Sequence, residues 1–357
     1  MNDHFLSDAD FQAIPAVEIN PSVPPDGAPL VSVLMITWNH GAFVARAIES
    51  VVGQACPFRF ELLIGEDASG DETRAVCEDY QGRYPDIIRL IVAESNVGMH
   101  RNLARLWWRA RGRYIALCEG DDYWSDSCKL AKQAAWLEAR PTVWMCGAYT
   151  RKVARDAGGD WVEVGSVRPA RVKERYGVED LIPDYAFHTS SVLVRREGIR
   201  FPRWFWDLYC ADRPLYLLCA ERGDVGVIRE VMSVYRLHEG GVWAPAGLVD
   251  KAEKGISLFE TLDAYFEGRY HALIRRTLAN IIWSYMASAL DAGHLAPARR
   301  LYWLSLRYRT PGGLARSGRY WAVAWLRLYG PRLYRWLKRW EGAVGGRDRS
   351  TEEGRGS

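Results

Sequence analysis

Short apolar runs alternate with helical periodicity between residues 31 and 141, and this alternation restricts the fold more than any other feature of the sequence. The runs 31–36, 60–64, 87–92 and 113–118 are typical of strands buried on both faces of a sheet. Apolar residues then recur at helical spacing after each run. Strands and helices that alternate in this way predict an α/β fold: a Rossmann-like, mostly parallel sheet with right-handed crossovers and helices on both faces.

The chain divides into four segments by composition. Residues 1–28 end in PSVPPDGAP and predict a flexible or extended N-terminal arm, while residues 29–245 carry the alternation and form the predicted main domain. Residues 246–340 predict a helical, basic and Trp-rich C-terminal region, because positions 292–340 hold eleven Lys or Arg and five Trp but no Asp or Glu. Residues 341–357 predict a disordered tail.

The overall composition excludes several classes of protein. A formal net charge of +3 in 357 residues is too small to indicate nucleic-acid binding. Seven scattered Cys without a C-x-x-C pair favour free thiols in a reducing compartment over disulfides or a zinc site. The acidic N-terminus lacks the pattern of a signal peptide, and the apolar stretch 278–290 is too short and too polar to span a membrane. We therefore expect a cytoplasmic protein.

Polar side chains follow each of the four predicted strands. Because ligands bind beyond the carboxyl ends of the strands in such sheets, these side chains predict one site at one rim. The fourth strand is followed by CEGDDYW, in which Asp121 and Asp122 suit Mg²⁺ or Mn²⁺ shared with a diphosphate. An isolated G-D-D could instead be an acidic loop or a helix cap that binds no metal. The polar residues at the four strand ends are Thr37, Trp38 and Asn39; Glu66 and Asp67; Glu94 and Asn96; and Asp121 and Asp122.

Three long segments of the main domain carry a family resemblance. In chain order they are VSVLMITWNHGAFVARAIESVVGQ, ELLIGEDASGDETRAVCEDY and NVGMHRNLARLWWRARGRYIALCEGDDYWSDSCKLAKQAAWLE. They resemble family-two glycosyltransferases, which share the GT-A fold, and the resemblance covers residues 30 to about 243. It implies a nucleotide-sugar donor, by default a UDP-sugar, a divalent metal (Mg²⁺ or Mn²⁺) and inversion at the anomeric carbon.

The resemblance also implies roles for individual residues around the donor. Those that contact the nucleotide are Thr37, Trp38, Asn39, Asp67, Asn96, Arg101 and Asp121. Among them, Asp67 matches the acid that hydrogen-bonds the base, and Asp121 lies nearer the ribose. Asp122 is implied as a metal ligand, and His238 in SVYRLHEGGVW as a metal or phosphate ligand. Ordinary loop and cap roles are the alternative for Asn96 and Arg101.

A transferase also needs a carboxylate that takes the proton from the acceptor hydroxyl. The resemblance places this base at Asp212 in DLYCADRPLYLLCAERGDVGVI, with Asp207 and Asp224 as alternatives. It also suggests an acceptor or sugar pocket, whose candidate residues are His188, Thr189, Trp124 and Trp243. For Trp243, packing on the core as a flap residue is the alternative.

Interleaved Arg and Trp in the C-terminal region fit helices at a membrane surface, or a helical subdomain that packs on the main domain. The predicted function is metal-assisted, inverting transfer of a sugar to a glycan or lipid-linked acceptor in bacterial cell-envelope polysaccharide synthesis. We expect it in the cytoplasm or peripherally on the inner face of the cytoplasmic membrane. Nucleotidyl transfer at the Asp pair and a catalytically inactive nucleotide-sugar-binding module are the alternatives, and nucleic acid is not an expected partner.

Overall fold

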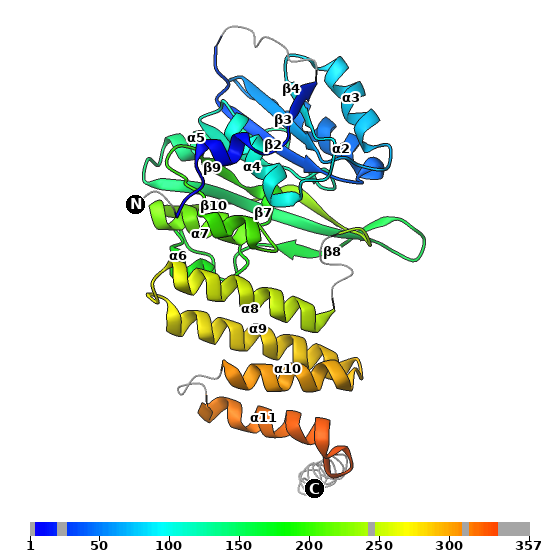
Figure 1. Ribbon diagram of the computed structural model, residues 1–357, viewed down its shortest axis with the longest axis vertical. Coiled ribbons are helices and arrows are strands. Elements are labelled where there is room, and N and C mark those ends of the chain that lie inside the picture. The colour runs from blue at the N-terminus through cyan, green and yellow to red at the C-terminus, as the bar shows by residue number, and fades with distance from the viewer. Residues whose placement is uncertain (1–3, 20–26, 242–246, 309–313, 335–357) are drawn as a thin grey trace, which may run out of the picture. The chain divides into compact units, whose positions relative to one another are not determined.

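A computed structural model describes residues 4–19, 27–241, 247–308 and 314–334, the last range with side chains from residue 321 onward. The chain divides into two compact units, Met1–Ala244 and Pro245–Ser357, each described by itself below (Figure 1). Unit 1 contains a ten-stranded sheet in the order β1-β4-β3-β2-β5-β9-β7-β10-β6, with β8 paired to β7. Its strands are β1 (Val17–Ile19), β2 (Val31–Thr37), β3 (Phe60–Glu66), β4 (Ile88–Val92), β5 (Tyr114–Leu117), β6 (Tyr123–Trp124), β7 (Val143–Arg155), β8 (Trp161–Val167), β9 (Leu193–Arg195) and β10 (Asp224–Leu237).

Four neighbouring strands, β4-β3-β2-β5, run parallel, so their carboxyl ends share one rim. They correspond to the four predicted strands, and the predicted α/β fold is confirmed. Alternate residues of β2 show that both faces of the sheet are buried. Val33 and Met35 join one hydrophobic core, while Leu34, only 2% exposed, points to the opposite face.

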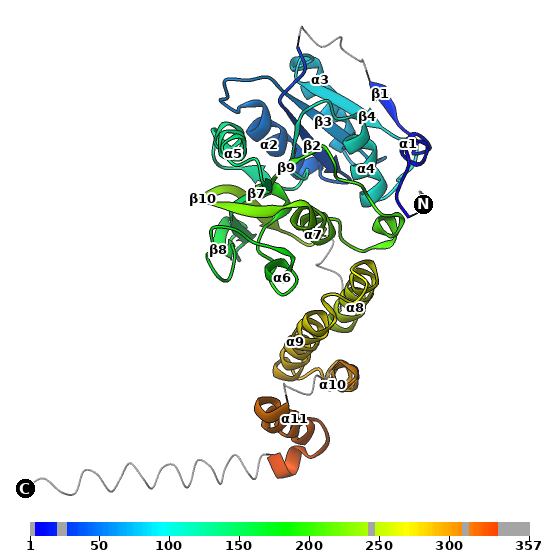
Figure 2. The ribbon, with the colours of Figure 1, turned by 90° about the vertical axis from the view of Figure 1, so that its left-hand side faces the viewer.

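Helices cover both faces of this sheet, as Figure 2 shows. Buried residues of α2, α3 and α5 share one hydrophobic core with β2, β3 and β4, and α4 packs on β2 and β3 from the other side. Gly65 allows this second contact, because a Cβ there would lie 2.1 Å from Oδ1 of Asn102 on α4. The helices of unit 1 are α1 (Asp8–Gln12), α2 (Gly41–Val52), α3 (Thr73–Arg83), α4 (Met99–Arg109), α5 (Lys129–Glu138), α6 (Val178–Leu181) and α7 (Asp212–Arg222), with the 3₁₀ helices η1 (Thr189–Ser191) and η2 (Arg203–Asp207).

Part of the N-terminal segment, for which we expected a flexible or extended arm over residues 1–28, forms regular structure. A capping box between Ser7 and Asp10 begins α1, and β1 pairs antiparallel with β4. Arg89 on β4 ties the strands together, because its Nε donates to Glu18 Oε1 at 2.7 Å and its Nη1 to Glu61 Oε2 at 3.1 Å. Local composition does not reveal this edge strand, since Arg89 lies 71 positions after Glu18.

In unit 2, four successive helices each pack on the next along the chain, and the described residues 331–334 are helical as well. They are α8 (Leu248–Tyr265), α9 (His271–Asp291), α10 (Leu295–Arg307) and α11 (Leu314–Tyr329). The predicted helical C-terminal region is therefore confirmed. Within the described ranges, none of the helices has both the length and the apolar character needed to cross a membrane.

Gly147 on β7 lets Phe187 pack directly against the sheet, because a Cβ at this position would lie 2.1 Å from the Phe187 ring. We expect Gly147→Ala to lower the free energy of unfolding by about 1–3 kcal/mol through overpacking. Gly82→Ala on α3 is the matched control: nothing lies within 4 Å of the added Cβ, so stability should rise by about 0.5–1 kcal/mol. Urea denaturation measures both variants, and an unchanged stability of Gly147→Ala would contradict the tight contact.

Candidate functional site

The loops after β2 and β3 meet at the carboxyl-end rim of the sheet. The amide of Asp67 donates to the carbonyl of Thr37 at 3.1 Å. Asn39, in the left-handed region at φ 54°, joins the two loops: its amide donates to Ser69 Oγ at 3.0 Å, and its Oδ1 accepts from the Gly70 amide at 2.8 Å. These two strand ends therefore converge, as the sequence predicted.

The nucleotide residues predicted at this junction differ in accessibility. Trp38 is 51% exposed, so its ring is accessible for stacking on a ligand. Asp67 is buried, and its two carboxylate oxygens accept hydrogen bonds from the amides of Val97 and Gly98, both at 3.0 Å. Arg105 lies 3.5 Å from the same carboxylate. Asp67 thus fixes the loop after β4, and its contact with a base stays a prediction.

Asn96 and Arg101 lie at the surface of the loop after β4 and of α4. Asn96 Oδ1 accepts from the Gly98 amide at 2.8 Å, and the Arg101 guanidinium lies 5.2 Å from the ring centre of Trp206. Glu66 points inward instead, fully buried, where its Oε1 accepts from the Ser69 amide. These contacts shape the loops, and the roles of Asn96 and Arg101 toward a nucleotide stay predictions.

Residues 118–122 follow β5 and are here called the acid loop. Gly120 lets this loop run close beside the end of β2, because a Cβ at position 120 would lie 2.4 Å from Oγ1 of Thr37 and 2.9 Å from Nδ1 of His40. The Gly120 amide also donates to the carbonyl of Ile36 at 3.0 Å. The glycine in CEGDDYW is thus required by the close approach of two strand-end segments.

Arg236 on β10 holds the acid loop from the other side. Its amide donates to Asp122 Oδ1 at 3.0 Å, and its guanidinium donates to the backbone carbonyls of Asp121 and Phe43. The sequence analysis singled out the segment SVYRLHEGGVW but gave Arg236 no role. Arg236 stands near the end of β10, two positions before His238, and this proximity to the predicted ligand is the signal that could have identified it.

Asp121 faces two imidazoles at the rim. Its Oδ2 lies 3.2 Å from Nε2 of His238 and 3.7 Å from Nε2 of His40. Burial on its own would raise the pKa of Asp121, but the hydrogen bond from His238 and the nearby His40 lower this pKa to about 2. Burial lowers the pKa of His40, against the opposing charge of Asp121. Asp121 is therefore an anion at neutral pH. His40, which directly follows TWN, was missed by the sequence analysis.

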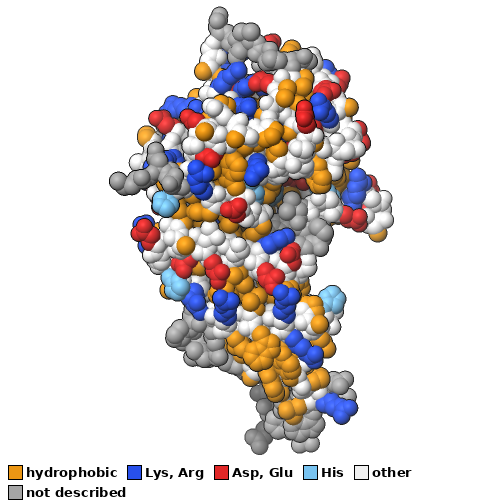
Figure 3. Space-filling model, viewed as in Figure 1, with side chains coloured by type: hydrophobic (Ala, Val, Ile, Leu, Met, Phe, Trp, Pro, Cys, Tyr) orange, Lys and Arg blue, Asp and Glu red, His pale blue; other side chains and the backbone are white. Residues whose placement is uncertain are grey.

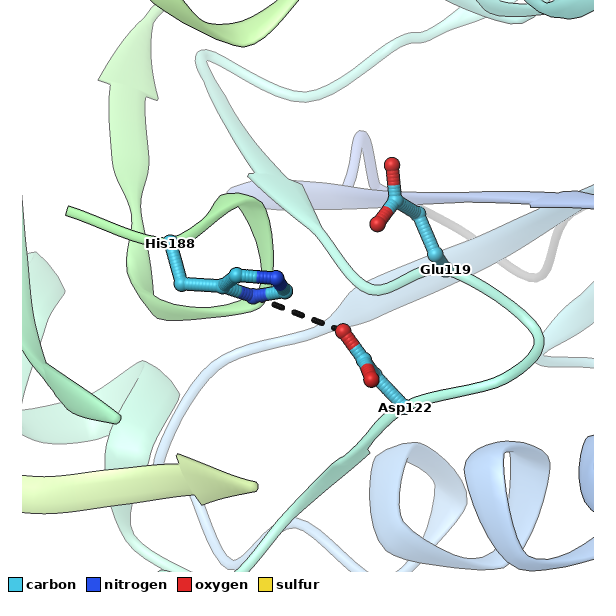
Figure 4. Close-up of side chains that lie close together, drawn as sticks. All are labelled: Glu119, Asp122 and His188. Atoms are coloured by element: carbon cyan, nitrogen blue, oxygen red, sulfur yellow. Dashed lines mark ion pairs between the residues drawn. The ribbon is translucent and has the colours of Figure 1, made fainter. Parts of the chain in front are cut away.

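Asp122 points into the protein. Its side chain is fully buried, and its Oδ2 lies 3.4 Å from Nδ1 of His188 with no hydrogen-bond partner among the described residues. Beside it, Glu119 Oε2 accepts from the Thr189 hydroxyl at 3.0 Å. Glu119, Asp122 and His188 each offer one ligand atom within 4.8 Å of the others (Figure 4). Asp122 thus contacts His188, whereas His238 contacts Asp121. The predicted roles of Asp122 and His238 toward a metal stay predictions.

Burial controls the charges of this inner cluster. It raises the pKa of Asp122 well above its ordinary value and, together with the charge of Asp121, raises that of Glu119 to about 8. It lowers the pKa of His188, which stacks on Tyr235 at 4.2 Å, to about 4. Without a cation, burial therefore disfavours the charged form of all three side chains.

Two sets of donors must be compared as cation sites. In the inner cluster Glu119 is partly exposed, but the side chains of Asp122 and His188 are 0% and 5% exposed, which leaves little access for a substrate phosphate. The side chains of Asp121 and His238 are 17% and 13% exposed at the rim. A divalent cation that shares its ligands with a diphosphate needs such access. The carboxylate and imidazole of Asp121 and His238 therefore fit the cation better.

Asp212 begins α7 and faces the same region. Its Oδ2 accepts from the Tyr185 hydroxyl at 2.6 Å, and its Oδ1 accepts from the Arg213 amide at 2.7 Å. The charge of Asp212 contributes to raising the pKa of Glu119 and opposes the lowering of the His188 pKa. The predicted base therefore lies within electrostatic reach of the acid loop. Tyr185 was missed, because nothing in its local sequence connects it with Asp212.

The two alternative bases lie in other surroundings. Asp207 ends η2 and is exposed. Asp224 begins β10, and its Oδ2 accepts from Nη1 of Arg175 at 2.8 Å in a surface ion pair.

Trp124 does not line a pocket, in contrast to the prediction. It is 4% exposed within the hydrophobic core, its indole Nε1 donates to the Ser190 carbonyl at 2.8 Å, and Nζ of Lys129 lies 4.3 Å from its ring centre. The pairing of β6 with β10 turns Trp124 inward. His188 and Thr189 do lie beside the acid loop. Trp243 lies outside the described residues.

Comparison with known sequences gives a family match in this part of the chain. Residues 32–196 match the family described as Glycosyl transferase family 2. An uncharacterized protein of Mycobacterium tuberculosis (strain H37Rv) is 32% identical over 216 residues, which are 60% of this chain and 61% of the relative. The chain thus spans about three fifths of the length of this curated relative. A Bacillus subtilis protein named as a teichuronic acid biosynthesis glycosyltransferase, TuaG, is 30% identical over 122 residues, 34% of this chain and 47% of the relative.

Two solved structures show the same fold. The mannosyltransferase PcManGT from Pyrobaculum calidifontis, in complex with GDP-Man and Mn²⁺, is similar with a TM-score of 0.51 at 18% identity, over 92% of each chain. Residues 1–349 of S. aureus TarS, in complex with UDP-GlcNAc, are similar with a TM-score of 0.50 at 16% identity, over 81% of this chain and 92% of that chain. These similarities confirm the predicted GT-A fold.

Lys129, buried under Trp124, should make stability depend on pH. Burial lowers its pKa from 10.5 to about 7, so between about pH 7 and 10.5 the unfolded chain holds one proton more than the folded chain. Stability therefore rises with pH in this window, by up to about 1.4 kcal/mol per pH unit. The wild type should therefore gain stability relative to Lys129→Met as pH rises from 7 to 9. Urea denaturation of both proteins at each pH measures this difference.

Lys132→Met is the matched control on the same helix. Lys132 is exposed, and hydrogen bonds with Asp126 and Glu230 raise its pKa, so this variant should show a constant stability difference from pH 7 to 9. A constant difference for Lys129→Met as well would mean that Lys129 is charged in the folded protein.

Proposed function

Residues 32–196 match the family described as Glycosyl transferase family 2, and from this match we propose that the protein transfers a sugar from a nucleotide-diphosphate sugar to an acceptor hydroxyl. The observation that carries the proposal is the position of Asp212, whose charge acts on Glu119 of the acid loop. A potential base and a potential donor site thus lie within electrostatic reach of each other. A UDP-sugar is the proposed donor, since TarS was solved with UDP-GlcNAc, although PcManGT holds GDP-Man.

Asp121 and His238 are the residues that would hold a divalent cation. Asp121 keeps its negative charge because its pKa is about 2, and His238 Nε2 lies 3.2 Å from its Oδ2. An anionic oxygen and an imidazole nitrogen suit Mn²⁺, the ion present in the PcManGT complex. When bound, the cation would stabilise the negative charge that develops on the leaving diphosphate.

Asp212 is the proposed general base. The Tyr185 hydroxyl donates to one of its oxygens and so orients the carboxylate. Partial burial and the charge of Asp212 raise the pKa of Tyr185 well above its ordinary value, so the phenol keeps its proton. The carboxylate can then accept the proton of the acceptor hydroxyl while that oxygen attacks the anomeric carbon. The bond from this carbon to the phosphate oxygen breaks on the opposite side, so the configuration is inverted.

A glycan or lipid-linked glycan of the bacterial cell envelope is the proposed acceptor. The support comes from a relative whose name places it in teichuronic acid biosynthesis. His188 and Thr189, beside Glu119 and Asp122, are the proposed neighbours of the acceptor or the transferred sugar, because they lie on the segment between the acid loop and β9.

Asp121→Asn should abolish the metal-dependent part of donor binding. In the wild type, Mn²⁺ together with UDP or GDP should raise the melting temperature, and ligand at a hundredfold excess over Kd adds about 2.7 kcal/mol to stability. Asp121→Asn keeps the shape of the side chain but removes its charge, so the additional shift caused by Mn²⁺ should disappear. Thermal-shift measurements with each nucleoside diphosphate, with and without Mn²⁺, test this expectation.

Asp122→Asn is the matched control from the same loop. It keeps an oxygen for the Arg236 amide, and we expect it to retain the Mn²⁺-dependent shift. The opposite result, in which Asp122→Asn loses this shift and Asp121→Asn keeps it, would place the cation in the inner cluster of Glu119, Asp122 and His188. Loss of the free Mn²⁺ signal in electron paramagnetic resonance reports binding independently of melting.

Asp212→Asn should lower the catalytic rate by about 10²–10⁴-fold, which is the usual contribution of a general base. Donor binding should be unchanged, because Asp212 is proposed to contact the acceptor. The measurement is the release of nucleoside diphosphate, with water as the acceptor, from a set of sugar donors that carry the nucleotide identified by thermal shift. Asp207→Asn is the control from the preceding segment and should retain the wild-type rate. If Asp207→Asn were the inactive variant, the base would be assigned to the wrong residue.

A further inference from the structure

Unit 2 exposes three aromatic side chains that contact one another. Trp303 on α10 is 59% exposed, and Trp325 and Tyr329 on α11 are 46% and 40% exposed. The indole Nε1 of Trp303 donates to the Tyr329 hydroxyl at 2.8 Å, and the rings of Trp325 and Tyr329 lie 5.8 Å apart. We call these three residues the aromatic patch.

A buried aromatic layer supports the patch from below. Tyr302 and Trp321 are 7% and 8% exposed, and their rings lie 5.5 Å apart. Tyr302 contacts both Trp303 and Tyr329 of the patch. Because Tyr302 and Trp321 already occupy the space between the helices, the outer aromatic rings cannot withdraw from solvent without displacing them. The patch is therefore a fixed feature of the surface.

The surroundings of the patch are cationic. The Arg299 guanidinium lies 5.3 Å from the ring centre of Tyr329, and Arg332 is exposed three positions after Tyr329. Positions 292–340 contain no Asp or Glu. The neighbouring acid Asp291 is already paired with Arg327 at 2.9 Å. In Figure 3, hydrophobic side chains gather over the C-terminal helices and Lys and Arg border them.

We propose that the aromatic patch docks the protein on an anionic membrane surface. Trp and Tyr combine an apolar ring with a polar tip, which suits the boundary between headgroups and acyl chains. Arg side chains beside such rings attract anionic headgroups. The structure refines the sequence pattern, because Trp321 belongs to the buried layer and Tyr329, which the pattern did not include, joins the patch.

Charge complementarity favours lipid over a second copy of the chain. In a symmetric dimer formed through the aromatic patch, the patch of one copy would contact the same patch of the other copy. Arg299 and Arg332 would then face the same cations with no acid from positions 292–340 to pair with them, and like charges in contact oppose association. Anionic headgroups supply the missing negative charge. The inference concerns unit 2 and does not depend on the donor site.

Co-sedimentation of the full chain with vesicles tests the proposal. We expect binding to phosphatidylcholine vesicles that contain about one third phosphatidylglycerol, and much weaker binding to phosphatidylcholine alone. The double variant Trp303→Ser, Trp325→Ser should lower the partition coefficient at least about tenfold, because it removes most of the apolar contact. Arg332→Glu should weaken binding to the anionic vesicles and leave binding to the neutral vesicles unchanged.

Trp108→Ser is the matched control, because it removes a Trp of unit 1 that is 37% exposed. It should bind vesicles like the wild type, and circular dichroism should show that all variants are folded. The proposal is overturned if the double variant sediments with anionic vesicles as the wild type does. It is also overturned if the wild type binds neither vesicle, or if light scattering shows an oligomer that the double variant dissociates. RNA that displaces the protein from vesicles at equal phosphate concentration would assign the surface to nucleic acid instead.

Discussion

The acid loop depends on Arg236. Three carboxylates within four positions repel one another, so a loop that brings them to a sheet edge needs a cation and several donors to hold it. Arg236 supplies them: its amide binds the Asp122 carboxylate, and its guanidinium binds the carbonyl of Asp121 and, at 3.0 Å, that of Phe43 on α2. Burial lowers the pKa of Arg236, while Asp122 and Asp121 oppose this shift. A residue 114 positions after Asp122 therefore shapes the rim.

The hydrogen bonds from Arg236 hold the three acids of the loop in two different environments. Asp121 faces His238 and His40 and is an anion above about pH 2. Asp122 is fully buried and Glu119 is partly buried, and burial raises both pKa values. One loop thus offers a permanent anion at the rim and, behind it, a cluster in which burial disfavours the charged forms. Three full negative charges at the rim would repel a diphosphate. With a single carboxylate beside an imidazole, one cation is enough for the site to bind the diphosphate.

The sequence predicted the parallel sheet and its rim, because burial on both faces and helical spacing are local patterns that residues 31–141 display clearly. It did not predict which of two adjacent aspartates faces outward, since that choice depends on Arg236 and His188. It placed Trp124 in a pocket, although the pairing of β6 with β10 turns this residue into the core. Trp124 contacts Ser190, and Asp122 contacts Arg236. Each of these partners lies more than 60 positions away along the chain, so a local sequence pattern carries no information about it.

The net charge of +3 includes both an acidic cluster in unit 1 and a basic segment at positions 292–340. Glu119, Asp121, Asp122 and Asp212 act on one another's pKa values or on those of shared neighbours in unit 1, whereas positions 292–340 hold no acid at all. An acidic site repels a diphosphate until a cation intervenes, while a cationic surface with exposed Trp and Tyr attracts anionic headgroups directly. Total charge cannot distinguish these cases because it sums over both. The contacts of each cluster determine which anion it can bind and whether it needs a metal to do so.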